Sequence, residues 1–376
     1  MIKLTTAGES HGKMLVGIIE GLPSNLPIDI DEIDRYLALR QCGYGRGGRQ
    51  KIEKDRVEIL SGVRNKLTLA SPLAFCVKNN DYANWQPYMA PEGADVTQKT
   101  LTRVRPGHAD LTGIIKYDQT DARNILERAS ARETAVRVAG GTIARQYLRA
   151  LGVEVSGYVK SVCGVSDNSA HTFEELESAK NQPLFMLDDG VQKKAMALID
   201  KLKEEGDTAG GVVEVRVKGL KSGFGSCMTY AQKLDAVLCG AVMSVQAIKG
   251  VEVGMGFAVA DNAGSKVHDE IFAKGGKYVR TTNNAGGIEG GMSNGEEIAL
   301  RAAMKPIPTL MKGLRTVDTA TGESAIAASE RSDVAAICAC EIILESVVCT
   351  ALADVVSQRL GGDNLKEVKE RYALLP

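Results

Sequence analysis

Two histidines lie in glycine-flanked loops among polar and charged neighbours. His11 stands in Gly8-Glu9-Ser10-His11-Gly12, and His108 stands in Arg105-Pro106-Gly107-His108-Ala109-Asp110. Imidazole is the side chain that both donates and accepts a proton near neutral pH. Most histidines are hydrogen-bonded core or surface residues, but the adjacent Ser, Arg and Asp favour acid–base chemistry at these two positions.

The adjacency of Ser10 and His11 does not indicate a Ser-His-Asp hydrolase. Neighbouring residues in a loop rarely point at one another, and the chain has no G-x-S-x-G elbow. The other histidines, His171 and His268, lie in polar stretches and are expected to be solvated. The eight cysteines form no C-x-x-C pair and no zinc-type spacing, which predicts reduced, packed thiols without a disulfide framework or a metal site.

Arginines in the first half of the chain could bind phosphate or carboxylate. Arg40 and Arg46 border a glycine-rich loop whose backbone N–H groups could bind the same anion. Arg128 stands beside a small polar patch, and Arg132 follows four residues later, which predicts one shared helix face. Pairing with surface carboxylates is the simpler interpretation of such charges, and it suits Arg137 better than the others.

Glycine makes up 40 of the 376 residues, about 11% against an average near 7%. One cluster spans 286–295 and is followed by Lys305-Pro306-Ile307-Pro308-Thr309. Neither segment matches G-x-G-x-x-G or G-x-x-x-x-G-K-[ST], the usual nucleotide fingerprints. A lysine and two prolines near a glycine loop indicate a stiff wall for a flat, anionic ligand.

The overall charge is balanced, with 46 basic and 47 acidic side chains and a formal net charge of -1. A protein that holds nucleic acid over its whole surface needs a basic excess, so this class is excluded. No apolar run approaches the roughly 20 residues of a membrane span, and the N-terminus has no apolar signal region. We therefore expect a cytoplasmic protein with no membrane segment and no nucleic-acid partner.

Apolar periodicity predicts the elements that position these residues. Strands are expected at 13–19, 51–61, 73–77, 153–162, 211–220 and 251–260, and helices at 29–40, 121–151, 174–178, 191–205, 233–245 and 332–360. The segment 82–120, with its prolines and glycines, is expected to be a loop.

The long helices are apolar almost all round, so they must be covered on more than one side and belong in a middle layer. The strands come in hairpin-like runs without regular strand–helix alternation. This pattern predicts an α+β fold with sheets packed around helices. No repeat and no linker divides the chain, so residues 1–376 are expected to form a single domain.

Residue chemistry alone leaves the reaction open. It indicates a pocket with several Arg, a Lys and two His around a ligand that bears phosphate and carboxylate groups. A phosphate-ester hydrolase that uses His11 or His108 fits this pocket. A non-catalytic anion- or RNA-binding module fits less well, because only 5% of the residues are aromatic and could stack on bases.

Seven segments, in order, resemble blocks of the chorismate synthase family, and the likeness extends over almost the whole chain. The segments are 8–12 with 15–23, 43–46, 59–63, 105–110, 127–134, 286–295, and 331–333 leading into an apolar helix with Glu341. Seven ordered matches are far more specific than any single motif.

The resemblance implies a lyase that converts 5-enolpyruvylshikimate 3-phosphate to chorismate and phosphate by anti-1,4-elimination, the last step of the shikimate pathway. The family requires reduced FMN without consuming it, and NADPH is a candidate source of reductant. The hydrogen that leaves is allylic and poorly acidic, so a simple general base would struggle. In the family the reduced flavin lends an electron, phosphate departs, and the flavin accepts the hydrogen. The implied fold is a β-α-β sandwich, a helical layer between two antiparallel sheets, in a homotetramer.

The resemblance also carries residue roles by position. His11 would interact with the reduced flavin and its proton, and His108 would protonate the departing phosphate. Asp333 would take part in proton removal through the flavin. Ser10 and Ser130 would orient the histidines. The implied flavin contacts are Arg128, Ala129, Ser130, Gln246, Ala247, Gly290, Lys305, Pro306, Ile307, Pro308, Thr309 and Arg331, and the implied ligands of substrate or NADP phosphate are Arg40, Arg46 and Arg132.

Overall fold

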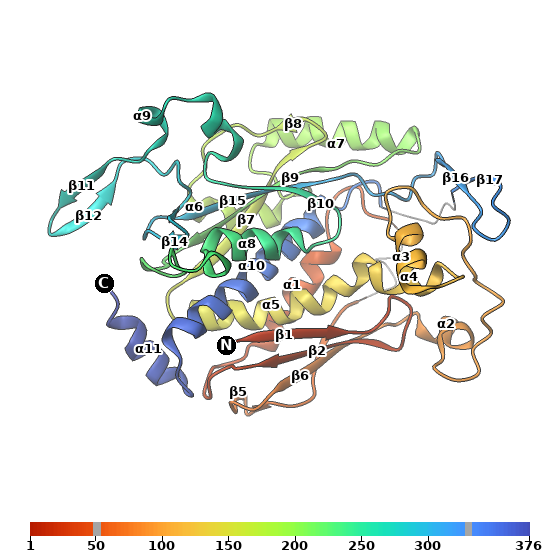
Figure 1. The fold of residues 1–376 in the computed structure, drawn as a ribbon, viewed down its shortest axis with the longest axis horizontal. Coiled ribbons are helices and arrows are strands. Elements are labelled where there is room, and N and C mark those ends of the chain that lie inside the picture. Colours follow the sequence, from red (N-terminus) through yellow and green to blue (C-terminus); the bar gives the residue numbers. More distant parts are fainter. Residues whose placement is uncertain (48–53, 328–332) are drawn as a thin grey trace.

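In the computed structural model, two antiparallel sheets enclose a layer of helices (Figure 1). The structure describes residues 1–47, 54–327 and 333–376. The first sheet has the order β1-β2-β6-β3, formed by Lys3–Ala7, Met14–Glu20, Leu73–Lys78 and Val57–Ile59. The second has the order β10-β15-β9-β7-β8, formed by Ile248–Val253, Ile298–Met304, Gly211–Lys218, Glu154–Val162 and Val165–Ser166. The predicted α+β sandwich is confirmed.

Four helices form the middle layer: α1 (Ile30–Gln41), α5 (Thr134–Arg149), α8 (Leu234–Met243) and α10 (Ile337–Leu360). Helix α10 buries residues on all its faces, as its apolar sequence predicts. It packs directly on α5, where a Cβ on Gly141 would lie 2.4 Å from the carbonyl oxygen of Ser346. Only glycine permits this close helix contact.

Helix α1 begins where the sequence predicts, because the carboxylate of Asp29 accepts hydrogen bonds from the N–H groups of Asp31 and Glu32. It ends at Gln41, and Gly43 and Gly45 follow with φ of 115° and 83°. These conformations favour glycine, so the chain can turn sharply here and carry Arg46 back toward the helix end.

The predicted single helix over 121–151 is wrong. The chain forms α4 (Arg123–Ala129), a 3₁₀ turn (Ala131–Glu133) and then α5. Ser130 between them is extended, with φ -60° and ψ 141°, and its hydroxyl accepts from the N–H of Arg132. Serine competes for backbone donors in this way, and here it caps a new helical turn instead of continuing the old one.

Other boundaries also differ from expectation. The supposed loop 82–120 contains α2 (Tyr82–Met89) and α3 (Asp110–Tyr117), and the strand predicted to reach residue 260 gives way to a 3₁₀ helix (Gly256–Asp261). The strand predicted over 51–61 is only β3 within the described residues, and 51–53 lie outside them. Short amphipathic segments carry too few residues to fix periodicity, so tertiary packing decides them.

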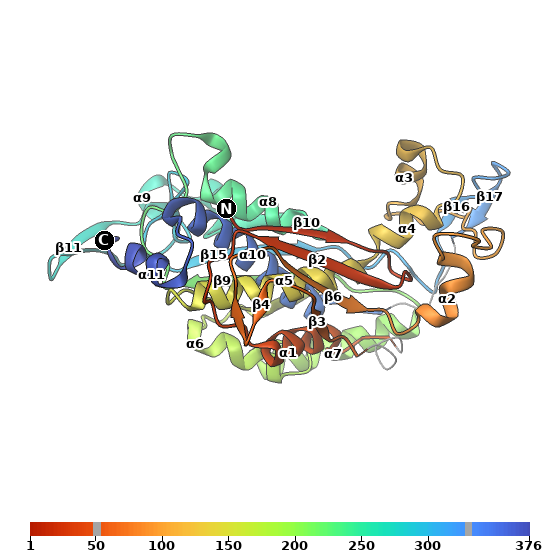
Figure 2. The same ribbon diagram turned by 90° about the horizontal axis from the view of Figure 1, so that it is seen from below.

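Two groups of elements extend beyond the sandwich (Figures 1 and 2). At one end, α2, α3 and α4 lie with the hairpin β16–β17 (Arg315–Val317 and Ser324–Ile326), and we name this group the end lobe. At the opposite end lie α9 (Gly264–Val267) and the hairpin β11–β12 (Ile271–Lys274 and Lys277–Arg280), which we name the arm.

Smaller elements complete the described chain. They are β4 (Val63–Arg64), β5 (Leu67–Thr68), α6 (Phe173–Leu176), α7 (Asp189–Glu204), β13 (Ile288–Glu289), β14 (Met292–Ser293), α11 (Leu365–Ala373) and the 3₁₀ helices Glu177–Asn181 and Tyr230–Gln232. Within the described ranges, no helix combines the length and apolar character that crossing a membrane requires.

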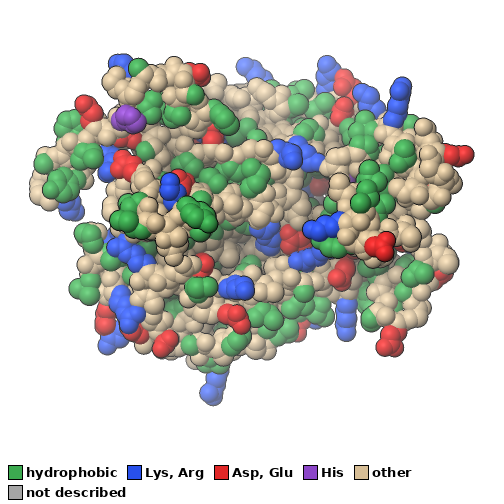
Figure 3. Space-filling view, viewed as in Figure 1, with side chains coloured by type: hydrophobic (Ala, Val, Ile, Leu, Met, Phe, Trp, Pro, Cys, Tyr) green, Lys and Arg blue, Asp and Glu red, His purple; other side chains and the backbone are tan. Residues whose placement is uncertain are grey.

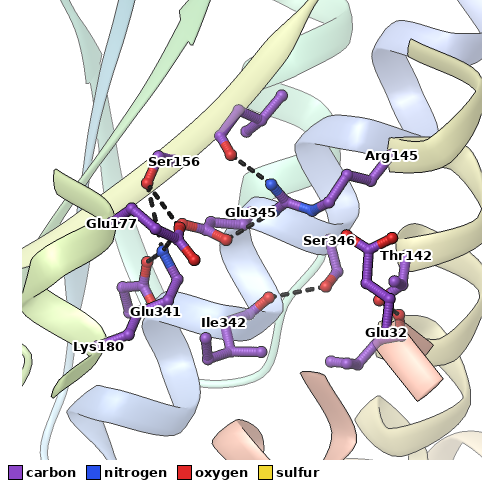
Figure 4. Close-up of polar contacts among 12 residues, drawn as sticks. Glu32, Thr142, Arg145, Ser156, Glu177, Lys180, Glu341, Ile342, Glu345 and Ser346 are labelled. Atoms are coloured by element: carbon purple, nitrogen blue, oxygen red, sulfur yellow. Dashed lines mark hydrogen bonds and ion pairs between the residues drawn. The ribbon is translucent and has the colours of Figure 1, made fainter. Parts of the chain in front are cut away.

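A buried charge cluster interrupts the apolar middle layer (Figure 4). Glu341 and Glu345 lie one turn apart on α10 and are both fully buried. The ammonium of Lys180 lies 2.8 Å from Glu345 and 3.8 Å from Glu341, and Arg145 on α5 pairs with Glu345 at 2.6 Å. Burial first, and then the neighbouring Glu345 carboxylate, raise the pKa of Glu341 well above its usual value despite Lys180. The buried Glu341 carboxyl is therefore harder to ionise than an exposed one.

Candidate active site

His11 lies in the loop between β1 and β2, where Glu127 of α4 holds it. Its Nδ1 lies 2.9 Å from Oε1 of Glu127, and its backbone N–H donates to Oε2 at 2.8 Å. The backbone oxygen of Glu127 also accepts from the N–H of Ser10 at 2.9 Å. Burial alone would raise the pKa of Glu127, but the hydrogen bonds from His11 lower it below its usual value, so the carboxylate stays ionised.

Trp85 of α2 covers one face of the His11 ring. The two ring centroids are 3.8 Å apart and the ring planes differ by 25°. The Trp85 indole N–H donates to Asp81 at 3.0 Å, and Arg123 lies over the indole at 5.3 Å. Sequence reasoning missed both Glu127 and Trp85 as parts of the site. The available signals were that Glu127 begins one of the segments that resemble the family and that the chain has a single Trp.

The two predicted serines meet beside this histidine. The hydroxyl oxygens of Ser10 and Ser130 are 3.2 Å apart, and the break after α4 turns Ser130 inward. Ser10 is buried with 2% of its surface exposed. The structure therefore brings Ser10, His11 and Ser130 together, as the sequence predicts, although Ser130 donates to Ser10 rather than to the ring.

His108 has a carboxylate partner of its own at the start of α3. Its Nδ1 lies 2.5 Å from Oδ1 of Asp110. Arg105 donates to Asp110 through Nε at 2.8 Å and Nη2 at 3.0 Å. Asp110 is fully buried, which would raise its pKa, but the hydrogen bonds from His108 and Arg105 lower the pKa far below its usual value. Both candidate histidines thus rest on buried, ionised carboxylates.

The remaining two histidines differ in their exposure to solvent. His171 is not solvated, because its Nε2 lies 2.8 Å from Asp167 and its ring meets Tyr158 edge-on. His268 is exposed, as expected. All eight cysteines are free, but Cys42, Cys163 and Cys227 are exposed rather than packed.

Three predicted arginines pair with two acidic groups, the buried Asp55 and the partly exposed Asp333. Arg132 contacts both oxygens of Asp55 at 2.6 and 2.7 Å, and Arg40 contacts the same carboxylate at 3.0 Å. Arg46 pairs with Asp333 at 3.0 Å, and its Nη2 lies 3.5 Å from the backbone oxygen of Arg40. Burial opposed by Asp55 lowers the pKa of Arg40 to about 10.

Two of these guanidinium groups have unused donors. The Nε atoms of Arg40 and Arg46 are buried, and neither has a hydrogen-bond partner among the described residues. A buried donor without an acceptor costs free energy, about 1–3 kcal/mol. Such donors suit an anionic ligand that would supply the missing acceptors.

Arg128 does not share a face with Arg132, so that prediction is wrong. The break at Ser130 separates them, and Arg128 reaches the backbone oxygens of Gly8 and Thr6 at 3.0 and 3.1 Å. Arg128 instead borders an open cavity of 310 Å³, which Thr6, Arg128, Glu133, Arg137, Ser244 and Gln246 line. The amide of Gln246 donates to Glu133 at 2.8 Å, while its Oε1 is buried without a partner in the described part of the chain.

The segment Lys305–Thr309 lies against the His108 loop. The ammonium of Lys305 donates to the backbone oxygen of Gly107, and Arg105 lies 3.5 Å from the hydroxyl of Thr309. The N–H of Lys305 donates to Ala247 at 2.9 Å. Burial and the nearby Lys249 lower the pKa of Lys305. The segment Lys305–Thr309 therefore lies beside a catalytic candidate, without the glycine loop 286–295 that was predicted to join it.

Gly290 stands apart from the other predicted flavin contacts. It forms the turn between β13 and β14 with Gly291, and both have positive φ, 59° and 81°. This hairpin packs near the start of α8, whereas Gln246 follows the end of that helix. Ten helical residues rise about 15 Å, so one chain does not bring Gly290 to Gln246. Arg331 lies outside the described residues.

Hydrogen bonds connect most of the site into one region where the sandwich meets the end lobe. Glu133, next to Arg132, bonds to Gln246, and Ala247 bonds to Lys305 beside the His108 loop. Figure 3 shows this face hollowed toward the end lobe, with Lys and Arg side chains along the hollow. Residues from both ends of the sequence meet here, because α1 ends and α5 and α10 begin at this edge.

Two carboxylate-paired histidines and two buried guanidinium groups with free donors are features that suit an enzyme acting on a small anionic molecule. Comparison with known proteins gives its family. The chorismate synthase family model matches residues 2–357, and the chain belongs to the chorismate synthase family. This family consists of lyases of chorismate biosynthesis in the shikimate pathway. The hydrolase and RNA-binding alternatives are therefore wrong.

Individual relatives agree with this assignment. The chain is 54% identical to chorismate synthase of Alkaliphilus metalliredigens over 374 residues, which covers 99% of this chain and 98% of that protein. It is 54% identical to the enzyme of Pelobacter propionicus with the same coverage. A crystal structure of chorismate synthase superposes with a TM-score of 0.79 at 36% identity, and it covers 99% of this chain and 96% of that chain.

Proposed function

We propose that this chain converts 5-enolpyruvylshikimate 3-phosphate to chorismate and phosphate by anti-1,4-elimination, with reduced FMN as a cofactor that is not consumed. One observation carries the proposal: two carboxylate-held histidines, His11 and His108, belong to one bonded region with Arg40 and Arg46, whose buried Nε donors lack acceptors. A substrate with a phosphate and two carboxylates would supply those acceptors.

His108 is assigned to the departing phosphate. Asp110 holds its Nδ1, which leaves Nε2 to donate a proton to a phosphate oxygen. Arg105 lies 3.1 Å from the same ring and adds positive charge where the leaving group gains negative charge. Proton donation and charge stabilisation would thus act on the same bond.

His11 and Asp333 are assigned to the hydrogen that leaves the ring. His11 would hold the cofactor's proton at Nε2, because Nδ1 faces Glu127. Asp333 accepts from the N–H of Gly47 at 2.6 Å and pairs with Arg46, so its carboxylate is held in place near the proposed substrate arginines. Ser10 and Ser130 would shape the wall beside His11.

The cavity beside Arg128 suits the cofactor. A ligand with amide-like donors would satisfy the unpartnered Oε1 of Gln246, and its phosphate would meet Arg128 or Arg137. We assign cofactor contacts to Arg128–Ser130, Gln246, Ala247 and Lys305–Thr309. When bound, reduced FMN supplies an electron to an elimination that a simple base would drive poorly.

Arg40 and Arg46 are the proposed ligands of the substrate phosphate or of a nicotinamide nucleotide. Arg132, by contrast, is engaged with Asp55, Asn79 and Lys78, so we assign it to holding the Asp55 carboxylate against Arg40. NADPH is the proposed source of reductant for the flavin.

We also propose that the chain works as a cytoplasmic homotetramer. The arm and the adjoining 3₁₀ helix expose large apolar side chains, namely Phe257, Val259, Ile271, Phe272 and Tyr278. An exposed apolar group of this kind suits burial against another copy. Contact between copies would also allow Gly290 of one copy to lie near the proposed flavin site of another copy.

The decisive experiment is an anaerobic assay of phosphate release from the shikimate ester with and without reduced FMN. We expect release only when reduced FMN is present, with chorismate formed in equal amount. Equal release without flavin would overturn the proposal and would indicate an ester hydrolase. Turnover with oxidised FMN and NADPH but no separate reductase tests whether the chain reduces its own flavin, and omission of NADPH is the control.

A further inference from the structure

Glu127 grips both the backbone and the side chain of His11. Its Oε1 and Oε2 lie 2.9 and 3.0 Å from Nδ1, and Oε2 also accepts from the backbone N–H of residue 11 at 2.8 Å. Only 1% of the Glu127 surface is exposed. The carboxylate therefore has little solvent to compete for it, and its hydrogen bonds to His11 are strengthened.

A carboxylate that stays ionised can only accept hydrogen bonds, so the Nδ1 that faces it must carry a hydrogen. The lowered pKa of Glu127 agrees with an ionised carboxylate here. The neutral imidazole is then restricted to the Nδ1–H tautomer, and Nε2 is the nitrogen left to exchange a proton with a ligand. Without Glu127 the ring could adopt either tautomer and could turn about its side-chain bonds.

Trp85 restricts the remaining freedom of the ring. At a centroid distance of 3.8 Å the indole blocks one face of the imidazole, and Asp81 holds the indole N–H. The charged groups in contact with this pair include the carboxylates of Glu127 and Asp81. Arg123 lies 3.6 Å from Glu127, and Lys99 lies over the indole at 5.6 Å. Helix α2 has no buried residue, so core packing does not fix its position. The contacts of Trp85 with His11, Asp81 and the nearby cations therefore hold the indole in place.

We propose that Glu127 and Trp85 are positioning residues for His11: the carboxylate fixes the Nδ1–H tautomer, and the indole fixes the plane of the ring that presents Nε2 to the bound ligands. This inference rests on the proposed function only for its catalytic consequence. The tautomer and the stacking are properties of the protein without substrate or cofactor.

The test is nitrogen and proton NMR of the ligand-free protein with ¹⁵N-labelled histidine. The four histidines give four spin systems, and His11→Asn assigns the one from residue 11. In the wild type we expect a protonated, pyrrole-type Nδ1 at all pH values at which the protein is folded, and ring protons shifted upfield by the indole. Glu127→Ala is expected to convert much of His11 to the Nε2–H tautomer, and Trp85→Ala to abolish the upfield shift, while Trp85→Phe keeps part of it.

Kinetics give the second readout. Glu127→Gln should lower kcat by at least about tenfold, and by up to about 10⁴ as where an amide replaces the carboxylate behind a catalytic imidazole, with KM little changed. Glu174→Gln, an exposed carboxylate paired with Lys218, is the matched control and should change neither kcat nor the His11 signals. An unprotonated Nδ1 in the wild type, or unchanged His11 signals in Glu127→Ala, would overturn the inference. Loss of the proposed lyase activity in the wild type would leave the NMR result untouched.

Discussion

Arg46 and Asp333 form an ion pair of 3.0 Å that joins the glycine-rich loop after α1 to the segment before α10. The N–H of Gly47 donates to the same carboxylate at 2.6 Å. Val334 and Ala335 in turn donate to the backbone oxygen of Gly45. One junction therefore fixes a proposed phosphate ligand and a proposed proton acceptor relative to each other.

Arg46→Lys is expected to raise KM for the shikimate ester about tenfold, because lysine lacks the planar fork that serves Asp333 and a phosphate together. Steady-state kinetics under anaerobic conditions measure this change. Arg56→Lys is the control, since Arg56 is exposed and pairs with Asp34. An unchanged KM in Arg46→Lys would exclude Arg46 as a substrate ligand.

His11→Ala and His108→Ala are each expected to lower kcat by at least about tenfold while the fold survives, given the usual 10²–10⁴ contribution of acid–base groups. Circular dichroism checks the fold, and single-turnover assays measure the rate. His268→Ala, an exposed histidine outside the site, should behave as the wild type. Normal rates in both site variants would refute the assigned roles.

Asp110→Asn is expected to weaken both catalysis and folding, because Arg105 and His108 share that carboxylate. Its folded-state pKa is lowered, so its stabilising contribution is present above the usual value of 3.8 and is lost as pH falls below it. Tm should thus drop in the variant at pH 7, and the difference should shrink below about pH 4. A Tm difference that grows on acidification would contradict this account; Asp189→Asn, a surface carboxylate, is the control.

Glu341 and Glu345 are expected to respond oppositely to the same substitution. The pKa of Glu341 is raised in the folded state. The contribution of this residue to the free energy of unfolding is therefore fully present below the usual pKa of 4.5 and is lost progressively as the pH rises above 4.5. Glu341→Gln should remove this loss and raise Tm relative to the wild type, increasingly so toward pH 8. Thermal unfolding at several pH values measures the trend, and a Tm gain that is largest at pH 4 would refute it.

Glu345→Gln is the matched comparison. Glu345 is ionised, with a lowered pKa beside Lys180 and Arg145. Removing this charge takes one anionic partner away from two buried cations, Lys180 and Arg145. The free energy of unfolding should fall by about 3–5 kcal/mol. Equal Tm values for the two variants would mean that the cluster does not divide its charge as described.

Local patterns predicted much of the fold. The apolar sequence of α10 indicated burial on all sides, and Asp29 indicated the start of α1, because periodicity and caps depend on residues within a few turns. Ser130 ends α4 through a local hydrogen bond of its hydroxyl. The apolar pattern on both sides of Ser130 nevertheless predicted one continuous helix, so the break was not foreseen. Short segments such as α2 carried too little signal.

The sequence by itself determined the layered α+β architecture and a family resemblance spread over the chain, and it singled out His11 and His108 as candidates, with Asp333 added by the resemblance. The neighbouring Asp110 was already a signal for His108 in the sequence, whereas only the tertiary structure decided the carboxylate of the other ring: Glu127 meets His11 across 116 residues. The tertiary structure also decided that Arg132 faces Asp55 and that Gly290 lies apart. Periodicity reports whether a side chain is buried, but the identity of its neighbour depends on how distant segments pack.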